Sequence, residues 1–160
     1  YHSRKAFVVK ANRGLGWGDD PFSYMHIRYA DIVLLYAEAI IRTGGDKSEA
    51  VRYINDVRTR ANNSRGEDVE AVERVLIIPN IPLKMVSETD DLLAAVKHER
   101  RVELAMEYNR YYDLKRWGEY VDRMMEVRPG AFQKGRNEYF PIPQVEIDRT
   151  GGSITQNPGF

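Results

Sequence analysis

The sequence predicts a mostly α-helical fold, built from tetratricopeptide-like helical hairpins with long irregular loops. Apolar residues recur at helical spacing over 29–43, 47–62 and 89–107. The pair Gly44-Gly45 separates the first two segments, and so short a connection makes them antiparallel neighbours. Proline and glycine recur from Val127 onward, which is typical of loops.

The N-terminal residues 1–27 are expected to be irregular. Three glycines interrupt them between positions 14 and 18, and Asp19-Asp20-Pro21 is a turn signal. Residues 5–9 leave room for one short strand. The first firm helix therefore begins only after this stretch.

The first expected helix, Tyr29–Thr43, is apolar on almost every side. Its main face consists of Ala30, Val33, Leu34, Ala37, Ile40 and Ile41, and its narrow polar stripe of Asp31, Glu38 and Arg42. A helix of this kind is buried on several sides, yet one neighbouring helix covers only one of them. For the 160 residues alone, we therefore expect an exposed apolar patch beside Ile32, Leu35 and Ala39.

The second expected helix spans Lys47–Asn62. Asp46 stands where an N-cap belongs, and Glu49 three positions later completes a capping-box pattern. Its apolar stripe consists of Ala50, Tyr53, Ile54, Val57 and Ala61. This stripe is predicted to pack on the first helix.

Residues 67–88 are ambiguous, because 67–75 fits a short helix while the prolines that follow exclude one. A third helix is expected over Thr89–Glu107 and a fourth over Arg110–Met125. The chain after Val127 is expected to be loop. Two helical hairpins separated by a linker resemble tetratricopeptide packing, in which each unit spans ~34 residues.

Composition excludes several classes of function. Lys and Arg (24) balance Asp and Glu (24), so no overall field attracts nucleic acid, and no nucleic-acid partner is expected. The absence of cysteine rules out disulfides, zinc–thiolate sites and cysteine nucleophiles. No apolar run approaches the ~20 residues of a membrane helix. The chain begins at Tyr1, so we expect an excised piece with any targeting or lipid-anchor signal upstream.

No set of residues satisfies a catalytic or cofactor-binding motif. Gly14, Gly16 and Gly18 lack the Lys-Ser/Thr pair and the flanking elements of a phosphate loop. The three histidines are scattered, and no Gly-x-Ser-x-Gly elbow occurs. We therefore expect no catalytic residue, no metal site and no cofactor.

Charged residues share the apolar face of the third expected helix. At about 100° per residue, Arg100, Glu103 and Glu107 fall beside its leucines and valine. A glycosidase-like pair of Glu103 and Glu107 is one interpretation, but such a pair must flank a substrate. The favoured interpretation is a buried structural ion network, because desolvated charges need partners. It would pair Arg100 with Glu103, and Glu107 with Arg110 or Arg116.

Aromatic residues gather around the fourth expected helix, namely Tyr108, Tyr111, Tyr112, Trp117 and Tyr120. Sugars stack on such rings, but core packing is the favoured interpretation at this helical spacing. Trp17 differs, because it lies in a glycine-rich loop. It is the one residue nominated as a ligand-binding platform, and the other ligand-binding residues stay unknown.

The stretch from Glu99 to Trp117 places its charges in a distinctive order. It resembles the hallmark of the SusD/RagB family, roughly Glu-Arg-x-x-Glu-Leu-x-x-Glu-Gly-x-Arg-x-x-Asp-Leu-x-Arg-Trp. It departs from that pattern at Tyr108-Asn109 and Tyr111-Tyr112. The matching positions are Glu99, Arg100, Glu103, Leu104, Glu107, Arg110, Asp113, Leu114, Arg116 and Trp117.

Two further blocks carry the same resemblance. Residues 27–39, followed by Ile54-Asn55 and 57–61, are similar to the family's first C-terminal hairpin. Phe140-Pro-Ile-Pro143 and Gln156-Asn-Pro-Gly-Phe160 resemble its terminal signature. The blocks follow the family's order and span nearly the whole chain.

The resemblance implies more than the residues show. Members of this family are non-catalytic surface lipoproteins of Gram-negative outer membranes. They bind glycans or other nutrients and deliver them to a SusC-type TonB-dependent transporter. Residues 1–160 would form the C-terminal portion, with the N-terminal portion and its lipid anchor absent. No ligand-binding residue is transferred from the family to this sequence, and the charged residues that match its pattern are interpreted as structural.

Two other functions remain open from the residues themselves. The chain could be a helical-repeat scaffold for protein partners, without a small-molecule ligand. It could also be a glycoside hydrolase that uses the carboxylate pair. Affinity-gel binding of glycans separates a nutrient-binding protein from a scaffold, and turnover of a labelled oligosaccharide tests the hydrolase.

Overall fold

The computed structural model describes residues 25–63 and 83–160. The expected strand at 5–9, the glycine-rich stretch, the turn at 19–21 and most of 67–88 lie outside these residues. Within the described residues there are six helices and no strand. The mostly α-helical fold is confirmed.

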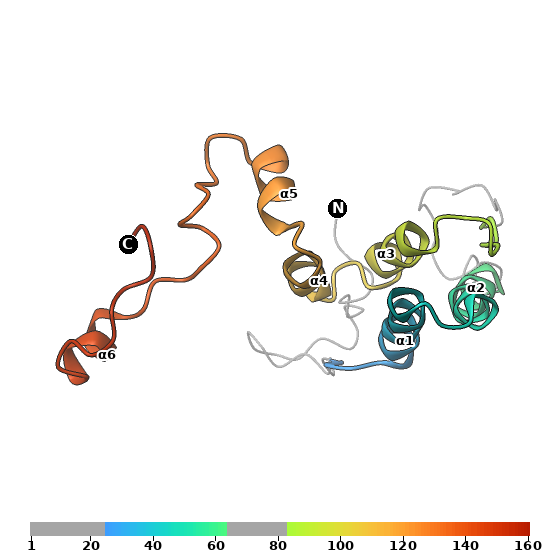
Figure 1. Cartoon of the computed structure of the whole chain (residues 1–160), viewed down its shortest axis with the longest axis horizontal. Helices are drawn as coiled ribbons and strands as arrows, with labels where there is room; N and C mark the ends of the chain where they lie inside the picture. The colour runs from blue at the N-terminus through green and yellow to red at the C-terminus, as the bar shows by residue number, and fades with distance from the viewer. Residues whose placement is uncertain (1–24, 64–82) are drawn as a thin grey trace, which may run out of the picture. The chain divides into compact units, whose positions relative to one another are not determined.

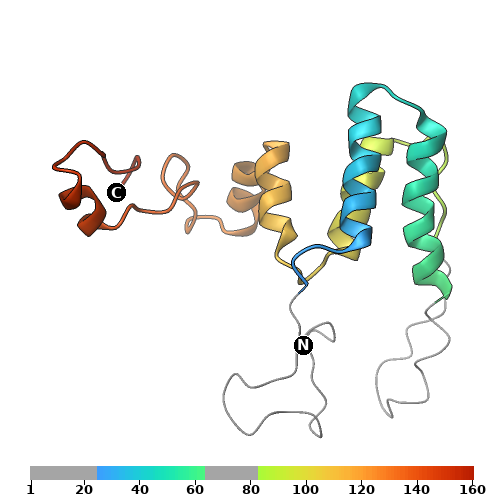
Figure 2. The ribbon, with the colours of Figure 1, turned by 90° about the horizontal axis from the view of Figure 1, so that it is seen from below.

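The first of two compact units ends at Glu107 and contains α1 (Tyr29–Thr43), α2 (Lys47–Asn63) and α3 (Leu92–Glu103). Helix α1 packs on both α2 and α3, and α1 runs antiparallel to α2 (Figures 1 and 2). Leu34, Ile54 and Val96, one from each helix, are fully buried where the three meet. The core of this unit is therefore organised around α1.

Local chemistry places the ends of the α1–α2 hairpin within one residue of the prediction. Gly44 adopts left-handed backbone (φ 70°), and the N–H of Gly45 donates to the carbonyl of Ile40 at 2.9 Å, which ends α1. The Asp46 carboxylate accepts the N–H of Ser48 at 2.9 Å and its hydroxyl at 2.8 Å. These hydrogen bonds from Ser48 lower the pKa of Asp46. A charged acceptor thus caps the start of α2.

Helix α3 is shorter than the 89–107 helix that the sequence predicts. It starts at Leu92, because the side chain of Asp91 accepts the N–H of Ala94 at 3.0 Å as an N-cap. It ends at Glu103, and Met106 (φ 67°) and Tyr108 (φ 65°) then adopt left-handed backbone. Two such residues cannot continue a right-handed helix.

The second unit, from Tyr108, contains α4 (Asn109–Trp117), α5 (Tyr120–Val127) and α6 (Gln144–Arg149). The prediction of one helix over 110–125 is wrong, because Gly118 adopts φ 74° and ends α4. The N–H groups of Gly118 and Glu119 close the turn on Lys115 and Leu114 carbonyls, at 3.1 and 2.9 Å. A new helix starts directly afterwards.

Helix α6 lies in the stretch predicted as loop. The carbonyl of Pro143 accepts the N–H of Glu146 at 2.9 Å, which starts the helix. Six residues are too few for an apolar period to show in the sequence. This unit buries few side chains, chiefly Asp113 and Leu114, and one long irregular segment joins α5 to α6.

Replacing Gly118 by alanine is expected to destabilise the protein by about 1 kcal/mol, since left-handed backbone costs a residue with a Cβ about 1–2 kcal/mol. A Cβ at this position meets nothing within 4 Å, so the whole cost comes from the backbone. Urea unfolding measures it. Gly118→Asn should retain most of the stability, because asparagine tolerates this conformation. Equal losses for both variants would contradict the backbone explanation.

Candidate functional site

The charged face of α3 is the most unusual feature of the first unit. Arg100 has only 3% of its surface exposed, and its Nη2 lies 2.9 Å from Oδ1 of Asp31 on α1. Arg100 Nη1 also donates to the main-chain carbonyl of Asp31 at 3.1 Å. Within residues 25–63 and 83–160, no aligned donor reaches Oδ1 of Asp31, so the contact between the two side chains is chiefly an attraction of charges.

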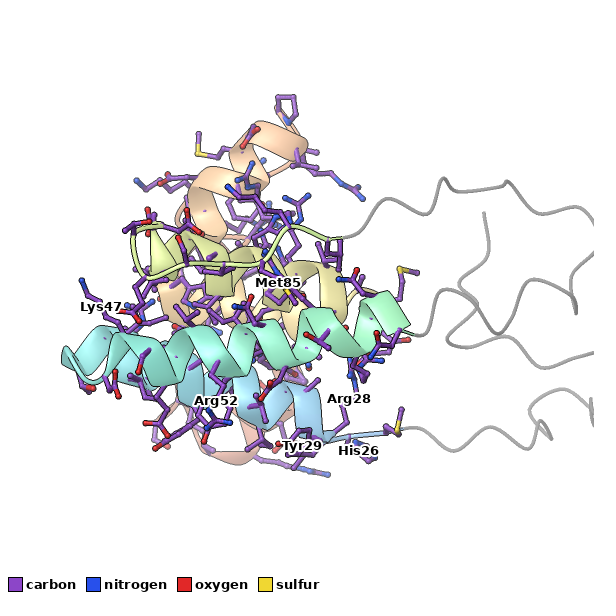
Figure 3. All side chains as sticks on the ribbon, turned by 90° about the vertical axis from the view of Figure 1, so that its right-hand side faces the viewer. His26, Arg28, Tyr29, Lys47, Arg52 and Met85 are labelled. Carbon is purple, nitrogen blue, oxygen red and sulfur yellow. The ribbon has the colours of Figure 1, made fainter. Side chains whose placement is uncertain are left out.

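Arg28, which directly precedes α1, joins the two glutamates that the sequence singled out. Its Nε donates to Glu107 Oε2 at 2.6 Å, and its Nη1 donates to Glu103 Oε1 at 2.7 Å. Its Nη2 donates to the main-chain carbonyl of Glu103 at 2.7 Å. Burial lowers the pKa of Arg28, but the hydrogen bonds and charges of Glu107 and Glu103 outweigh burial and raise it. Figure 3 labels Arg28 at the start of α1.

Helix α2 supplies two further cations to the same face of α3. Arg60 Nη2 lies 2.7 Å from Glu103 Oε1, so Glu103 accepts from two arginines. Arg58 Nε donates to Glu99 Oε2 at 2.7 Å, and the Glu99 side chain is 5% exposed. Ion pairs therefore connect α3 to both helices of the hairpin.

Sequence reasoning missed Arg28, Asp31, Arg58 and Glu99 as members of this network. It sought partners for Arg100 and Glu103 on the same helix, whereas the ion pairs described above join residues 41 to 79 positions apart. One signal was present, because Asp31 lies on the polar stripe of α1. The sequence does not show which stripe faces which helix.

The remaining predicted members lie in the second unit. Arg116 Nη2 is 2.9 Å from Asp113 Oδ1, and the Asp113 side chain is 4% exposed. The guanidinium groups of Arg110 and Arg116 lie 5.7 and 4.9 Å from the centre of the Trp117 ring. The predicted pairing of Glu107 with one of these arginines joins the two units and stays a prediction.

Glu103 and Glu107 have a geometry that suits structure better than catalysis. Both carboxylates bind the same guanidinium group, that of Arg28, instead of flanking an open space. Glycoside hydrolysis needs two carboxyl groups on either side of a scissile bond. The arrangement therefore favours a structural role for both glutamates.

The aromatic residues of the second unit surround a lysine. Nζ of Lys115 lies 5.0, 5.3 and 5.6 Å from the ring centres of Tyr120, Tyr139 and Tyr111. It also donates to the carbonyl of Glu138. Such contacts stabilise a cation by about 0.5–2 kcal/mol each, depending on its exposure. Lys115 thereby ties the segment around residue 138 to α4 and α5.

The prediction that these aromatics pack in a core is wrong for two of them. Tyr108 and Tyr112 are 73% and 66% exposed. Tyr111, Trp117 and Tyr120 are partly buried. Tyr108 precedes α4 in left-handed backbone and is not part of its face, and the side chains that α4 buries are those of Asp113 and Leu114, which follow Tyr112.

Trp17, the nominated ligand platform, lies outside the described residues. Among residues 25–63 and 83–160, no three histidine, aspartate or glutamate side chains gather as a metal site. In the same residues, no helix has both the length and the apolar character to cross a bilayer.

Replacing Arg100 by methionine should destabilise the protein by about 3–5 kcal/mol, because it leaves Asp31 without its buried cation. Adding Asp31→Asn should recover part of the loss, and thermal unfolding of the single and double variants measures it. The matched control is Arg149→Met, since Arg149 pairs with Glu146 on the surface. That change should cost less than about 1 kcal/mol. A similar small cost for Arg100→Met would contradict the buried pair.

Comparison with known proteins bears on the whole chain. A family model described as the SusD family matches residues 1–160. SusD-like protein P2 of Formosa agariphila is 32% identical over 163 residues, covering 99% of this chain and 30% of that protein. A SusD-like protein of Bacteroides ovatus is 28% identical over 110 residues, covering 67% of this chain and 16% of that protein.

The chain thus spans less than a third of the length of either relative. The family match includes all of the sequence blocks discussed above, from the α1–α2 hairpin to the terminal Gln156–Phe160 segment. It also agrees with the helical structure of both units. The chain belongs to the SusD family.

Proposed function

We propose that the intact protein binds a glycan or another nutrient at the outer-membrane surface and does not catalyse its conversion. The family match over residues 1–160 carries this proposal. The engagement of Glu103 and Glu107 by Arg28 supports its non-catalytic part. The bound nutrient would then pass to a SusC-type TonB-dependent transporter, the partner that the family resemblance implies.

The same proposal gives residues 1–160 the role of a C-terminal portion. Both relatives extend well beyond the region that matches this chain. The protein would be held at the cell surface by a lipid on an N-terminal segment upstream of these residues. The three-helix unit would then be a structural part of the binding protein, with its ion network holding the unit together.

The test of function uses the intact protein and a panel of soluble polysaccharides cast into native gels. We expect at least one polysaccharide to retard the protein and none to be cleaved, as judged by released reducing ends. Glu103→Gln should lower stability, because it weakens contacts to Arg28 and Arg60, while retardation persists. A helical-repeat scaffold would instead show no retardation by any polysaccharide.

Glu146→Gln is the matched control for this variant, since Glu146 pairs with Arg149 on the surface of α6. It should change stability by less than about 1 kcal/mol. Any polysaccharide turnover that disappears in Glu103→Gln, but survives in Glu146→Gln, would show that Glu103 is catalytic.

The outward face of α1 supports a partner within the same protein. Ile32 is 51% exposed and Tyr36 is 49% exposed, Ala39 is exposed, and Leu35 is only partly buried. We propose that the upstream portion of the intact protein covers this face. The apolar character of α1 on nearly every side is then explained, because each side meets another helix.

The piece of 160 residues is therefore expected to self-associate in water, or to bind the upstream portion when both are supplied. Sedimentation velocity measures both, with and without that portion. Ile32→Ser should weaken both forms of association, since it removes apolar area from the exposed face. Ile154→Ser changes another exposed apolar residue outside this face and is the control. A stable monomer that ignores the upstream portion would contradict the proposal.

A further inference from the structure

Asn55 on α2 forms two hydrogen bonds with the main chain of Val86, which is 31 positions away. Its Nδ2 donates to the carbonyl of Val86 at 2.9 Å, and its Oδ1 accepts the N–H of Val86 at 2.8 Å. One side-chain amide thus satisfies both polar groups of one residue, as a neighbouring β-strand would. Val86 is 7% exposed and belongs to the core, so its main-chain groups need such partners.

The geometry fixes which end of the amide faces which group. The Val86 N–H needs an acceptor and its carbonyl needs a donor, so only one orientation of the Asn55 amide satisfies both. Of the side chains with the same length, leucine offers neither group. Aspartate at neutral pH offers only acceptors. The position therefore specifies asparagine by chemistry and by size.

Two neighbours on the same stripe of α2 also bind main-chain atoms of this segment. Arg58 Nη1 donates to the carbonyl of Lys84. Asn62 Oδ1 accepts the N–H of Leu83 at 2.9 Å. In Figure 3 the segment that carries Met85 runs alongside α2. All of these contacts go to main-chain atoms of residues 83–86, so they do not depend on the side chains of that segment.

The segment 83–86, whose main chain these side chains bind, leads directly into α3. The Asp90 carboxylate accepts the N–H of Ser87 at 2.8 Å, and these contacts with Ser87 lower the pKa of Asp90. Asp91 then caps α3, whose first residue is Leu92. Only five residues separate Val86 from Leu92, the first residue of α3, so the position of Val86 restricts where α3 can begin.

We propose that Asn55 is a positioning residue that sets the start and the rotational register of α3. It seats Val86 in the core and thereby brings Glu99 and Arg100 to their partners on α2 and α1. The proposal goes beyond nutrient binding, because it assigns a role to one side chain within the three-helix unit and does not depend on any ligand.

In the second unit, another side-chain amide also bonds both the N–H and the carbonyl of a single residue. Gln156 Oε1 accepts the N–H of Ile142 at 2.8 Å, and Gln156 Nε2 donates to the carbonyl of Ile142 at 2.9 Å. Ile142 stands between two prolines, which have no N–H to offer. Like Val86, Ile142 lies just before a helix, since α6 begins at Gln144. Gln156 is accordingly the positioning residue for α6.

The test compares Asn55→Asp with Asn62→Asp in the intact protein. Aspartate at 55 loses the donor to Val86 at neutral pH, whereas aspartate at 62 still accepts the N–H of Leu83. We expect Asn55→Asp to lower the melting temperature by roughly 5 °C at pH 7. Asn62→Asp should change it by less than about 2 °C. The carboxylate still accepts the Val86 N–H, but loss of the donor to the Val86 carbonyl favours local opening, so exchange of the Val86 amide hydrogen should accelerate at least about tenfold only in Asn55→Asp.

The pH dependence of the stability loss in Asn55→Asp separates a lost hydrogen bond from lost packing, because lost packing would not vary with pH. When the introduced carboxyl is protonated it can donate to the Val86 carbonyl, so folding raises its pKa and favours the protonated form. The deficit of Asn55→Asp should therefore shrink as pH falls from 7 to 4. In the parent as well, Arg58 pairs with Glu99 and binds the Lys84 carbonyl, and the charges of Lys84 and Arg58 act on Asp90, so each variant is compared with the parent at the same pH.

The outcomes decide the proposal. A deficit in Asn55→Asp that exceeds that of Asn62→Asp, and narrows in acid, supports it. Equal melting temperatures for the two variants, or a deficit that does not change with pH, overturn it. If Asn55→Asp does not fold, Gln156→Glu repeats the test: it keeps the acceptor for the Ile142 N–H but loses the donor to the Ile142 carbonyl, so exchange of the Ile142 amide hydrogen should accelerate through local opening. Unchanged exchange at Ile142 would then overturn it.

Discussion

The need to neutralise buried charge on α3 constrains the rest of the three-helix unit. Arg100 and Glu99 are adjacent in sequence, nearly inaccessible to water and opposite in charge. Each finds its partner on a different helix, Asp31 on α1 and Arg58 on α2. A buried ion without a partner is costly, so α3 can lie against the hairpin in only one rotational setting.

Apolar packing alone would not impose that setting. The core residues of α1, α2 and α3 are mostly small or branched aliphatics, and cores of this kind lose a unique arrangement before they lose stability when such residues are exchanged. The charged contacts discriminate among such alternatives, because a rotation of α3 would strand several ions at once. Buried ionic groups contribute specificity in some folds at little gain in stability, and we propose that role for this network.

Sequence reasoning succeeded where the deciding interaction is local. Gly44 and Asp46 fix the ends of the α1–α2 hairpin through contacts within a few residues, and both were read correctly. It failed at Gly118, where a glycine inside a helical pattern was read as part of one long helix. It also could not find the partners of Arg100, because those depend on how three helices pack. The family resemblance identified the same charges but not their partners.

One hydrogen bond has a consequence for how this fold accommodates change. Asn62, near the end of α2, accepts the N–H of Leu83 at 2.9 Å, so these two residues lie side by side although they are 21 positions apart. In general, each doubling of the length of a connection between two neighbouring points adds only about 0.6 kcal/mol of closure entropy. A longer or shorter sequence between Asn62 and Leu83 is therefore expected to change the stability of the helices little. The same position is the natural place to insert a reporter domain.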